Sequence, residues 1–587
     1  MFEKYGMDLT REDGVPENWG RLMLLFPILI TAILYLSTAG GRAVIDYDEG
    51  YYSQGALQMI ERGDWVTPYV NGVRFLEKPP LMYWLTAASF NIFGINEFAL
   101  RFPTALAVIA LVWLVMLIAR RASDDRTSSI AGLCASCSAG TFLFTREALH
   151  DIWLVLFITL SMYAFFAWYV DSRHSLRHAL LFYAALAGAV MCKSLVGVAL
   201  PVGIVTLFFL LMRQWPGWSE LHFFTGTLLF LSLAVPWHWM ATIRNPDFLY
   251  SFFINEQFLR FIGKHDPPVL WSLPLLAFWG LVLVWFFPWT AFLPAAFGAF
   301  RKPSGTTERA LAKLSFAWIA VIMGFFSLSA RLEHYAFPML PALALLSGVA
   351  LSKTADSRAI KRAFRGLSAF GLIILAAGIG ATIWLVTYGR RLTGALSESS
   401  SRISATDFSI MAEMPASMIE ALLRPAAITI VALAAGFLAA LWFETRHRRM
   451  QAVFSITAAA LVLCGMAHWS LIICEDLISS KKFAVALAKE AHPSDRLVVI
   501  GDYESANSIS FYQPLHVEIF DGKAYALIPG MKYRDAPQIV LAKGEFEAAW
   551  RSETRVFVLL PKSRLADLNP GGVEMLAVLD RILVRNH

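Results

Sequence analysis

The chain has 587 residues, of which 57% are hydrophobic and only 16% are charged, and its mean hydropathy is +0.55. This apolar balance exceeds what the core of a soluble protein can bury, so it excludes an ordinary globular domain and indicates a membrane protein. The formal net charge is only +6. The basic loops described below account for this excess, so the composition gives no reason to expect a nucleic-acid partner.

The first 20 residues are acidic and polar, and they lack the apolar stretch of a signal peptide. We therefore expect residues 1–20 to form a cytoplasmic segment. Thirteen apolar stretches follow, and we expect each to cross the roughly 30 Å of hydrocarbon as a helix. They lie near residues 21–39, 98–119, 128–145, 151–170, 179–193, 195–212, 222–243, 270–299, 312–330, 334–352, 366–388, 424–443 and 452–473.

The short loops after the even-numbered spans are consistently basic, as Arg120 and Arg121 after the second span and Arg448 and Arg449 after the twelfth illustrate. Because Lys and Arg are enriched in cytoplasmic loops, this pattern places the N-terminus in the cytoplasm. The odd number of spans then places the C-terminus on the periplasmic side. The longer loops on that side span residues 40–97, 244–268 and 389–423.

After residue 480 the pattern changes to short β-rich runs that alternate with charged, helix-like segments. The runs at residues 497–500, 517–520 and 556–560 are typical of strands in a small α/β domain. The sequence therefore predicts a membrane domain over residues 21–473 and a periplasmic α/β domain over residues 480–587.

Paired carboxylates, Asp48 and Glu49, closely follow the first span. A carboxylate at this position can act as a general base or bind a divalent ion. The pair also fits the acidic first turn of a helix, where carboxylates interact favourably with the helix dipole. For an isolated Asp-Glu pair, this structural interpretation is the commoner one.

Two further motifs follow in the same loop, G-D-W at residues 63–65 and E-K-P-P at residues 77–80. Together with the Asp-Glu pair they resemble the bacterial members of the protein O-mannosyltransferase superfamily, in particular the lipid A aminoarabinose transferases. The resemblance implies a GT-C fold, which is a polytopic bundle of about thirteen transmembrane helices with exterior helices that carry the active site and a small C-terminal periplasmic α/β domain.

The resemblance also implies roles for individual residues of this loop. Asp48 would be catalytic, and Lys78 would help to hold the phosphate of a lipid carrier. Glu49 is placed in the same catalytic group as the second carboxylate of the pair. Tyr51 stands where the aminoarabinose transferases typically have arginine in a D-E-x-R-Y pattern. This difference leaves the sugar and the acceptor open.

Asp151 lies at the exterior end of the third span, in the segment T-R-E-A-L-H-D. Taken alone it would be a helix N-cap or an anchor at the membrane interface. The resembled family has a functional aspartate in this same loop. The resemblance therefore implies a supporting catalytic role for Asp151, in which it orients the donor sugar or the acceptor.

Further basic residues lie at exterior helix ends, where snorkelling alone could explain each of them. Lys193, Arg260 and Arg331 lie in segments similar to T-K-G, E-H-x-x-R-F and K-L-x-x-Y-x-x-P of the family, and Tyr335 completes the third. By this resemblance Lys78, Lys193, Arg260 and Tyr335 would surround the carrier phosphate, and Arg331 could contact substrate. Convergent cations stabilise the negative charge that grows on a departing phosphate.

Three residues are weaker candidates. Glu504 follows a predicted strand in a segment that loosely resembles the loop with which the family's exterior domain reaches back to the membrane site, so it could contact substrate. Glu77 and His265 are the most plausible metal-ligand pair, but a hydrogen-bonded interfacial histidine is the commoner situation. A requirement for a divalent metal is left open.

The function that the resemblance implies is inverting glycosyl transfer on the periplasmic face of a bacterial inner membrane. The donor would be a polyprenyl-phosphate-linked sugar, and the acceptor would be lipid A, lipopolysaccharide or another envelope molecule. If the acceptor is a hydroxyl, Asp48 would be the general base; if it is an ionised lipid phosphate, Asp48 would orient or bind it.

Three alternatives remain open: a transporter or flippase, an enzyme that acts on a protein acceptor, and a non-catalytic envelope-assembly protein that has kept only the fold. A multispan lipid or sugar transporter or flippase would also have many spans, but it typically has charges near the bilayer midplane and a repeated half, whereas the candidate residues here gather on one face. An enzyme similar to the protein O-mannosyltransferases could instead act on a protein acceptor.

Overall fold

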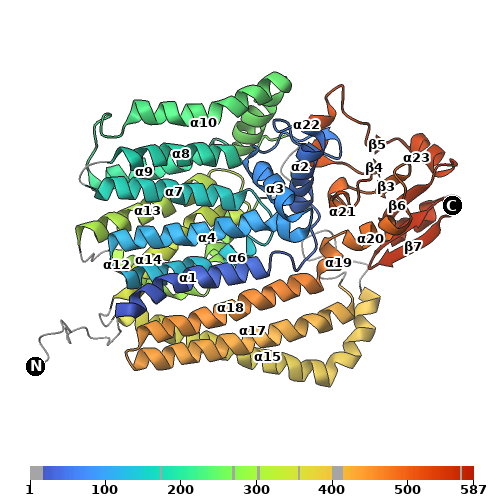
Figure 1. Ribbon diagram of the computed structural model, residues 1–587. Helices are drawn as coiled ribbons and strands as arrows, with labels where there is room; N and C mark the ends of the chain where they lie inside the picture. The colour runs from blue at the N-terminus through green and yellow to red at the C-terminus, as the bar shows by residue number, and fades with distance from the viewer. Residues whose placement is uncertain are drawn as a thin grey trace, which may run out of the picture.

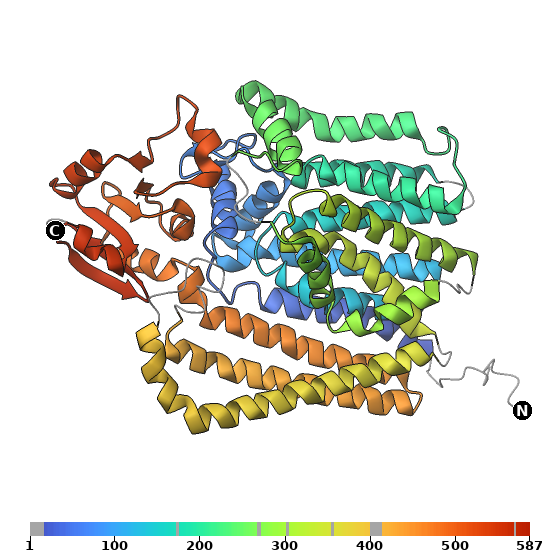
Figure 2. The same ribbon diagram turned by 180° about the vertical axis from the view of Figure 1, so that it is seen from behind.

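The computed structural model describes residues 17–171, 175–266, 272–300, 305–353, 357–399, 414–568 and 571–587. It consists of a bundle of long, roughly parallel helices with a small sheet domain at one end (Figures 1 and 2). The start of α1 lies at the end of the bundle away from this domain (Figure 1). The expected segment of residues 1–16 lies outside the described residues.

The bundle is built from apolar helices, which satisfy their backbone hydrogen bonds internally, as a hydrocarbon environment requires. Its long helices are α1 (Glu17–Ser37), α4 (Glu97–Ala122), α5 (Asp125–Ser136), α7 (Asp151–Val170), α8 (Leu176–Lys193), α9 (Val196–Met212), α10 (Phe223–Arg244), α13 (Thr306–Ser327), α14 (Leu340–Ser352), α15 (Arg358–Ser399), α17 (Ala416–Thr445) and α18 (Arg449–Ile473). Helices α15, α17 and α18 pack together as a layer along one side (Figure 1).

Shorter elements complete the bundle and its loops. These are α2 (Asp48–Arg62), β1 (Tyr69–Val70), β2 (Val73–Arg74), α3 (Leu81–Phe93), α6 (Ala139–Leu143), the π-helix η2 (Leu249–Leu259), α11 (Leu275–Trp285), η3 (Trp289–Phe292), α12 (Leu293–Phe300) and η4 (Glu333–Met339). Helices α2 and α3 lie at the bundle end that faces the sheet domain (Figure 1). The first long loop, residues 40–97, therefore contains two helices.

Within the described residues, every predicted span coincides with helical structure, with two departures from a straight helix. The stretch 128–145 is divided at Cys137, between α5 and α6. The stretch 270–299 bends by 100° between Leu275–Trp285 and Trp289–Gly298. In the described part of the chain, nine helices are long and apolar enough to cross a membrane, or ten if the bent pair counts as one span. The count of thirteen crossings stays a prediction.

The C-terminal domain contains one six-stranded sheet with strand order β5-β4-β3-β6-β8-β7. Strands β3, β4, β5 and β6 are parallel, and β8 pairs antiparallel with both β6 and β7. Its elements are α19 (Glu475–Ile478), α20 (Lys481–Glu490), β3 (Arg496–Ile500), η5 (Tyr503–Ser505), α21 (Ile509–Tyr512), β4 (Val517–Phe520), η6 (Tyr525–Leu527), α22 (Ile528–Met531), β5 (Val540–Leu541), α23 (Lys543–Trp550), β6 (Val556–Pro561), η7 (Lys562–Asp567), β7 (Val573–Val578) and β8 (Arg581–Arg585).

Alternate residues of the central strands face opposite sides of this sheet. On one side Val498 and Val558 pack against Phe546 and Trp550 of α23. On the other side the sheet packs against α20, and this core is continuous with that of the helical bundle. The sheet domain is therefore packed firmly against the bundle. The three β-rich runs that the sequence predicts as strands form β3, β4 and β6 of this sheet.

Candidate active site

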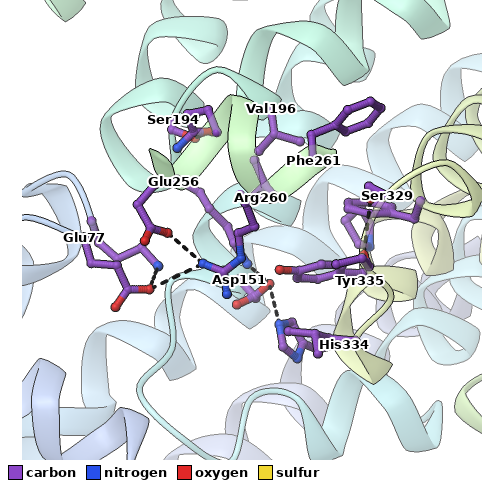
Figure 3. A pocket seen from close by; sticks show the side chains of 18 of the residues that line it. Glu77, Asp151, Ser194, Val196, Glu256, Arg260, Phe261, Ser329, His334 and Tyr335 are labelled. Atoms are coloured by element: carbon purple, nitrogen blue, oxygen red, sulfur yellow. Dashed lines mark hydrogen bonds and ion pairs between the residues drawn. The ribbon is translucent and has the colours of Figure 1, made fainter. Parts of the chain in front are cut away.

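A cavity of about 180 Å³ opens where the first long loop meets the ends of several bundle helices. Seven predicted site residues line it, although they come from distant parts of the sequence. They are Asp48, Glu77, Lys78, Asp151, Lys193, Arg260 and Tyr335. Figure 3 shows that Glu77, Asp151, Arg260 and Tyr335 point into the same space.

Asp48 is the first residue of α2, and its side chain is open to the cavity. The protein groups that surround this carboxyl reduce its solvation, which raises the pKa of Asp48 to about 6. The neighbouring Glu77 carboxylate also raises the pKa, whereas Lys78 lowers it. Among the described residues, no cation lies within ion-pairing distance of Asp48. The cavity therefore presents one unpaired carboxylate with a pKa close to neutrality.

Asp151 begins α7, where the partial positive charge of the helix N-terminus favours a carboxylate. Lys193, in the last turn of α8, forms an ion pair with Asp151, and Nε2 of His334 lies 3.9 Å from its Oδ1. The Lys193 ammonium also lies 5.4 Å from the ring centre of Tyr335. Asp151 thus lies within ion-pairing distance of two other cavity-lining groups, Lys193 and His334.

A second charge network surrounds Arg260. Its Nη1 lies 2.7 Å from Oε2 of Glu256 and 3.8 Å from Oε1 of Glu77, and Glu77 also pairs with Lys78 (Figure 3). Oε1 of Glu256 lies 2.5 Å from Nε2 of His265. Burial by itself would raise the pKa of Glu256, but the hydrogen bond to His265 and the charge of Lys78 outweigh burial and lower it to about 2.

The cavity also has an apolar wall. It is formed by Leu154, Val196, Phe261, Phe325, Phe326, Leu332 and Pro338. The ring of Phe326 packs at 4.8 Å from that of Tyr335, so this wall begins directly beside the charged residues. The same cavity therefore has both cationic lining residues (Lys78, Lys193 and Arg260) and an apolar wall, and this combination suits an amphipathic ligand.

Glu49 does not line the cavity, in contrast to its predicted place in the catalytic group. It is completely buried and accepts two hydrogen bonds of 2.7 Å from Arg101 and one of 3.0 Å from the Ala148 amide. Burial would raise the pKa of Glu49, but the charges of Arg101 and Arg42 outweigh burial and lower it. Adjacent residues on a helix point about 100° apart, so Glu49 can face the protein interior while Asp48 faces the cavity.

Two other predicted contacts also lie outside the cavity. The Arg331 guanidinium donates to the backbone carbonyls of Leu273, Ser327 and Ser329 and so ties two loops together. Glu504 accepts a hydrogen bond of 2.7 Å from the Tyr51 hydroxyl. Both residues therefore support the loops around the cavity in this structure.

The described residues contain no group of three or more His, Cys, Asp or Glu side chains placed to hold a metal ion. Glu77 is paired with Lys78, and His265 is paired with Glu256. The two candidate ligands therefore do not share a site here.

Sequence reasoning missed several residues that line the cavity. Glu256 lies four residues before Arg260, a spacing at which opposite charges meet on a helical face, so it could have been found. His334 immediately precedes Tyr335 and lines the cavity with it. Ser194 and Gln257 line the cavity and share a hydrogen bond of 2.5 Å, but no sequence signal pairs residues so far apart.

Residues 21–252 match the family model described as dolichyl-phosphate-mannose-protein mannosyltransferase. The chain is 32% identical over 340 residues to an uncharacterized protein of Aquifex aeolicus, an alignment that covers 57% of this chain and 73% of that protein. It is 31% identical over 377 residues to the undecaprenyl phosphate-alpha-4-amino-4-deoxy-L-arabinose arabinosyl transferase of Pseudomonas paraeruginosa. The chain belongs to the aminoarabinose-transferase-like glycosyltransferases of the protein O-mannosyltransferase superfamily.

The alignment with the Pseudomonas aminoarabinose transferase covers 61% of this chain and 64% of that enzyme. The fold of this family member matches the crystal structure of ArnT from Cupriavidus metallidurans bound to undecaprenyl phosphate. The TM-score is 0.78 at 22% identity, and the match covers 98% of this chain and 99% of the other. The predicted family and the GT-C fold, with its membrane bundle and small C-terminal sheet domain, are confirmed.

Proposed function

We propose that this protein is an inverting glycosyltransferase that moves a sugar from a polyprenyl-phosphate carrier to lipid A, lipopolysaccharide or another envelope acceptor on the periplasmic face of a bacterial inner membrane. The observation that carries the proposal is the convergence of Lys78, Lys193 and Arg260 on one cavity that also holds the unpaired carboxylate of Asp48. Its relatives in Pseudomonas are named for a donor of this chemical class.

The three cations suit a carrier phosphate. In Arg260, the Nη1 group already pairs with Glu256. The Nε group is buried and has no hydrogen-bond partner among the described residues. A phosphate oxygen that accepts from Nε would satisfy this donor. Lys78 and Lys193 then neutralise further negative charge, and the Tyr335 hydroxyl points toward the same space (Figure 3).

The apolar wall suits the lipid part of the same donor. The wall includes the rings of Phe261, Phe325 and Phe326. A polyprenyl chain can pack on these rings while its phosphate contacts the cations of the same cavity. Such an arrangement fixes the anomeric carbon, which lies one bond beyond the phosphate oxygen, at the Asp48 side of the cavity.

The reaction that this geometry supports is a single displacement. An acceptor oxygen attacks the anomeric carbon, the bond between that carbon and the phosphate oxygen breaks, and the phosphate leaves with the electron pair. When the acceptor is a hydroxyl, Asp48 takes its proton; when it is an ionised lipid phosphate, Asp48 positions it. Asp151 holds Lys193 where the negative charge grows on the leaving group.

The domain plan is part of the proposal. Residues 1–20 form a cytoplasmic segment, residues 21–473 form the membrane domain, and residues 480–587 form a periplasmic domain. The basic loops support this orientation. The start of α1 and the sheet domain also lie at opposite ends of the bundle, as this orientation requires (Figure 1). The active-site cavity then opens on the face where the carrier presents its sugar.

Envelope lipids of a strain that lacks the gene, complemented with the wild-type protein or with Asp48→Asn, test this proposal. Mass spectrometry should show a glycolipid that loses one sugar unit in the deletion strain and regains it only with the wild-type protein. Loss of a protein-linked sugar instead would favour the protein acceptor. Accumulation of unprocessed lipid on one leaflet, with no missing sugar, would favour the transporter or flippase.

A further inference from the structure

Tyr47, which directly precedes Asp48, has an unusual backbone. Its φ is 72° and its ψ is −124°, a region that glycine enters readily and that other residues rarely adopt. Its side chain is 61% exposed, so packing of the ring does not compensate for this conformation. Such a residue keeps a strained backbone only when its surroundings hold it there.

The holding group is Asn507, which belongs to the C-terminal domain. Its Oδ1 accepts a hydrogen bond of 2.9 Å from the Tyr47 amide, and its Nδ2 donates one of 2.8 Å to the Tyr47 carbonyl. One buried side chain therefore binds both polar backbone groups of the strained residue. The Tyr47 amide also donates to the backbone carbonyl of Glu504 at 3.1 Å.

Asn507 reaches this position because Gly50 leaves room for it. A Cβ atom at Gly50 would lie only 2.1 Å from Oδ1 of Asn507, so the first turn of α2 and this side chain fit together closely. Any larger residue at position 50 would force the two apart.

The residue before Tyr47 is held by the same domain. Asp46 accepts hydrogen bonds of 2.8 Å from the Ser508 amide and from the Ser480 hydroxyl, and Arg581 lies 3.7 Å away. The two residues that lead into α2 are thus both attached to the C-terminal domain. Asp48, which follows them, is the residue that the cavity exposes.

We propose that Asn507 is a positioning residue, which holds Tyr47 in its positive-φ conformation and thereby directs the Asp48 carboxylate into the active-site cavity. The inference rests on the proposed function for the role of Asp48, but the contact itself does not. Asn507 does not line the cavity, so it acts on the reaction only through the backbone of α2. The C-terminal domain is then part of the catalytic unit.

A glycine at position 47 shows whether Asn507 acts by holding the backbone of this residue, because glycine adopts the conformation without the hydrogen bonds from Asn507. We would compare Asn507→Ala, Tyr47→Gly and the double variant in the full-length protein. Asn586→Ala is the matched control, since Asn586 lies in the same domain and its amide also bonds to backbone carbonyls, those of Trp550, Ser552 and Thr554.

Turnover of a polyprenyl-phosphate sugar donor gives the first readout. We expect Asn507→Ala to lower kcat about tenfold or more with little change in the donor KM, since a small displacement of a catalytic group is costly to the rate. The double variant should regain a large part of this loss, and Asn586→Ala should keep the wild-type kcat. Unchanged kcat in Asn507→Ala, or a double variant no faster than Asn507→Ala, would overturn the inference.

Amide hydrogen exchange over residues 44–52 gives a second readout that needs no turnover. Asn507→Ala should exchange faster there than the wild-type protein, and Asn586→Ala should not. If the wild-type protein turns over no donor, the proposed function fails while this measurement still decides the contact. Equal exchange in Asn507→Ala and wild type would then count against the role of Asn507.

Discussion

Arg101 binds Glu49 through two hydrogen bonds of 2.7 Å, and the same Glu49 carboxylate accepts the amide of Ala148. One buried carboxylate therefore connects the turn that carries Asp48 to the loop that leads to Asp151. Glu49 therefore helps to fix the positions of Asp48 and Asp151 relative to each other.

Glu49→Ala should destabilise the protein strongly. The variant leaves Arg101, and Arg42 at 3.9 Å from the carboxylate, buried without their counter-charge, a loss of about 3–5 kcal/mol. Thermal unfolding in detergent should show a clearly lower Tm. Glu61→Ala, which removes an exposed carboxylate from the same helix, is the control and should leave the Tm nearly unchanged. Equal Tm values for the two variants would show that the connection contributes nothing.

Asp48→Asn should abolish transfer and leave the fold intact. The raised pKa of about 6 gives the sign of two pH effects. With a hydroxyl acceptor the carboxylate must be ionised, so wild-type kcat/KM should fall as the pH drops through about 6. Because the folded protein binds this proton more tightly than the unfolded chain, the stabilisation that the proton gives is present below the unfolded pKa and is lost as the pH rises through the folded pKa.

The asparagine variant is therefore expected to unfold at a slightly higher temperature than the wild type at pH 7.5, with no such gain at pH 4. Activity in Asp48→Asn equal to that of the wild type would remove Asp48 from the catalytic group.

Lys78→Ala should lower kcat/KM for the donor by about 100-fold, because a cation that stabilises the leaving phosphate is lost. Lys482→Ala is the control, since Lys482 is also paired with a carboxylate, Asp476, but lies in the C-terminal domain away from the cavity. Steady-state kinetics with a labelled polyprenyl-phosphate sugar make the comparison. Similar losses in both variants would leave the phosphate cradle without support.

The orientation in the membrane can be tested with single cysteines in a background without the native ones. A membrane-impermeant thiol reagent applied to spheroplasts should label a cysteine at Ser505 in the C-terminal domain. It should not label one at Ser123, in the exposed loop between α4 and α5 that follows Arg120 and Arg121. The reverse labelling would place the cavity on the cytoplasmic side and contradict periplasmic transfer.

The sequence predicted much of this structure where the determinants are local. The strand at residues 517–520 was predicted with its observed bounds, because alternation and β-branched residues are visible in a short window. The side chain of Asn96 caps α4 through the Ala99 amide, one residue before the helix begins at Glu97, whereas the span was predicted from residue 98. The 100° bend of residues 275–298 was not predicted, because an apolar run has the same composition whether it is straight or bent.

The site was predictable residue by residue only where a family motif marked it. Asp48 and Lys78, which the motifs mark, both line the cavity. Glu49 was predicted in the same catalytic group, but it does not line the cavity, since sequence neighbours on a helix face different ways. The contact of His334 with Asp151 joins helices that are distant in sequence, and only the packed structure brings them together.

The proposed glycosyl transfer can be measured as release of polyprenyl phosphate by the purified, reconstituted protein. The donors are undecaprenyl phosphates that carry aminoarabinose, a uronic acid or a hexose, and the acceptor is lipid A or core saccharide. We expect the wild-type protein to release the carrier from one of these donors and to glycosylate the acceptor with inversion at the anomeric carbon, whereas Asp48→Asn does neither. Absence of release from every donor, or equal release by Asp48→Asn, would contradict the proposed transfer.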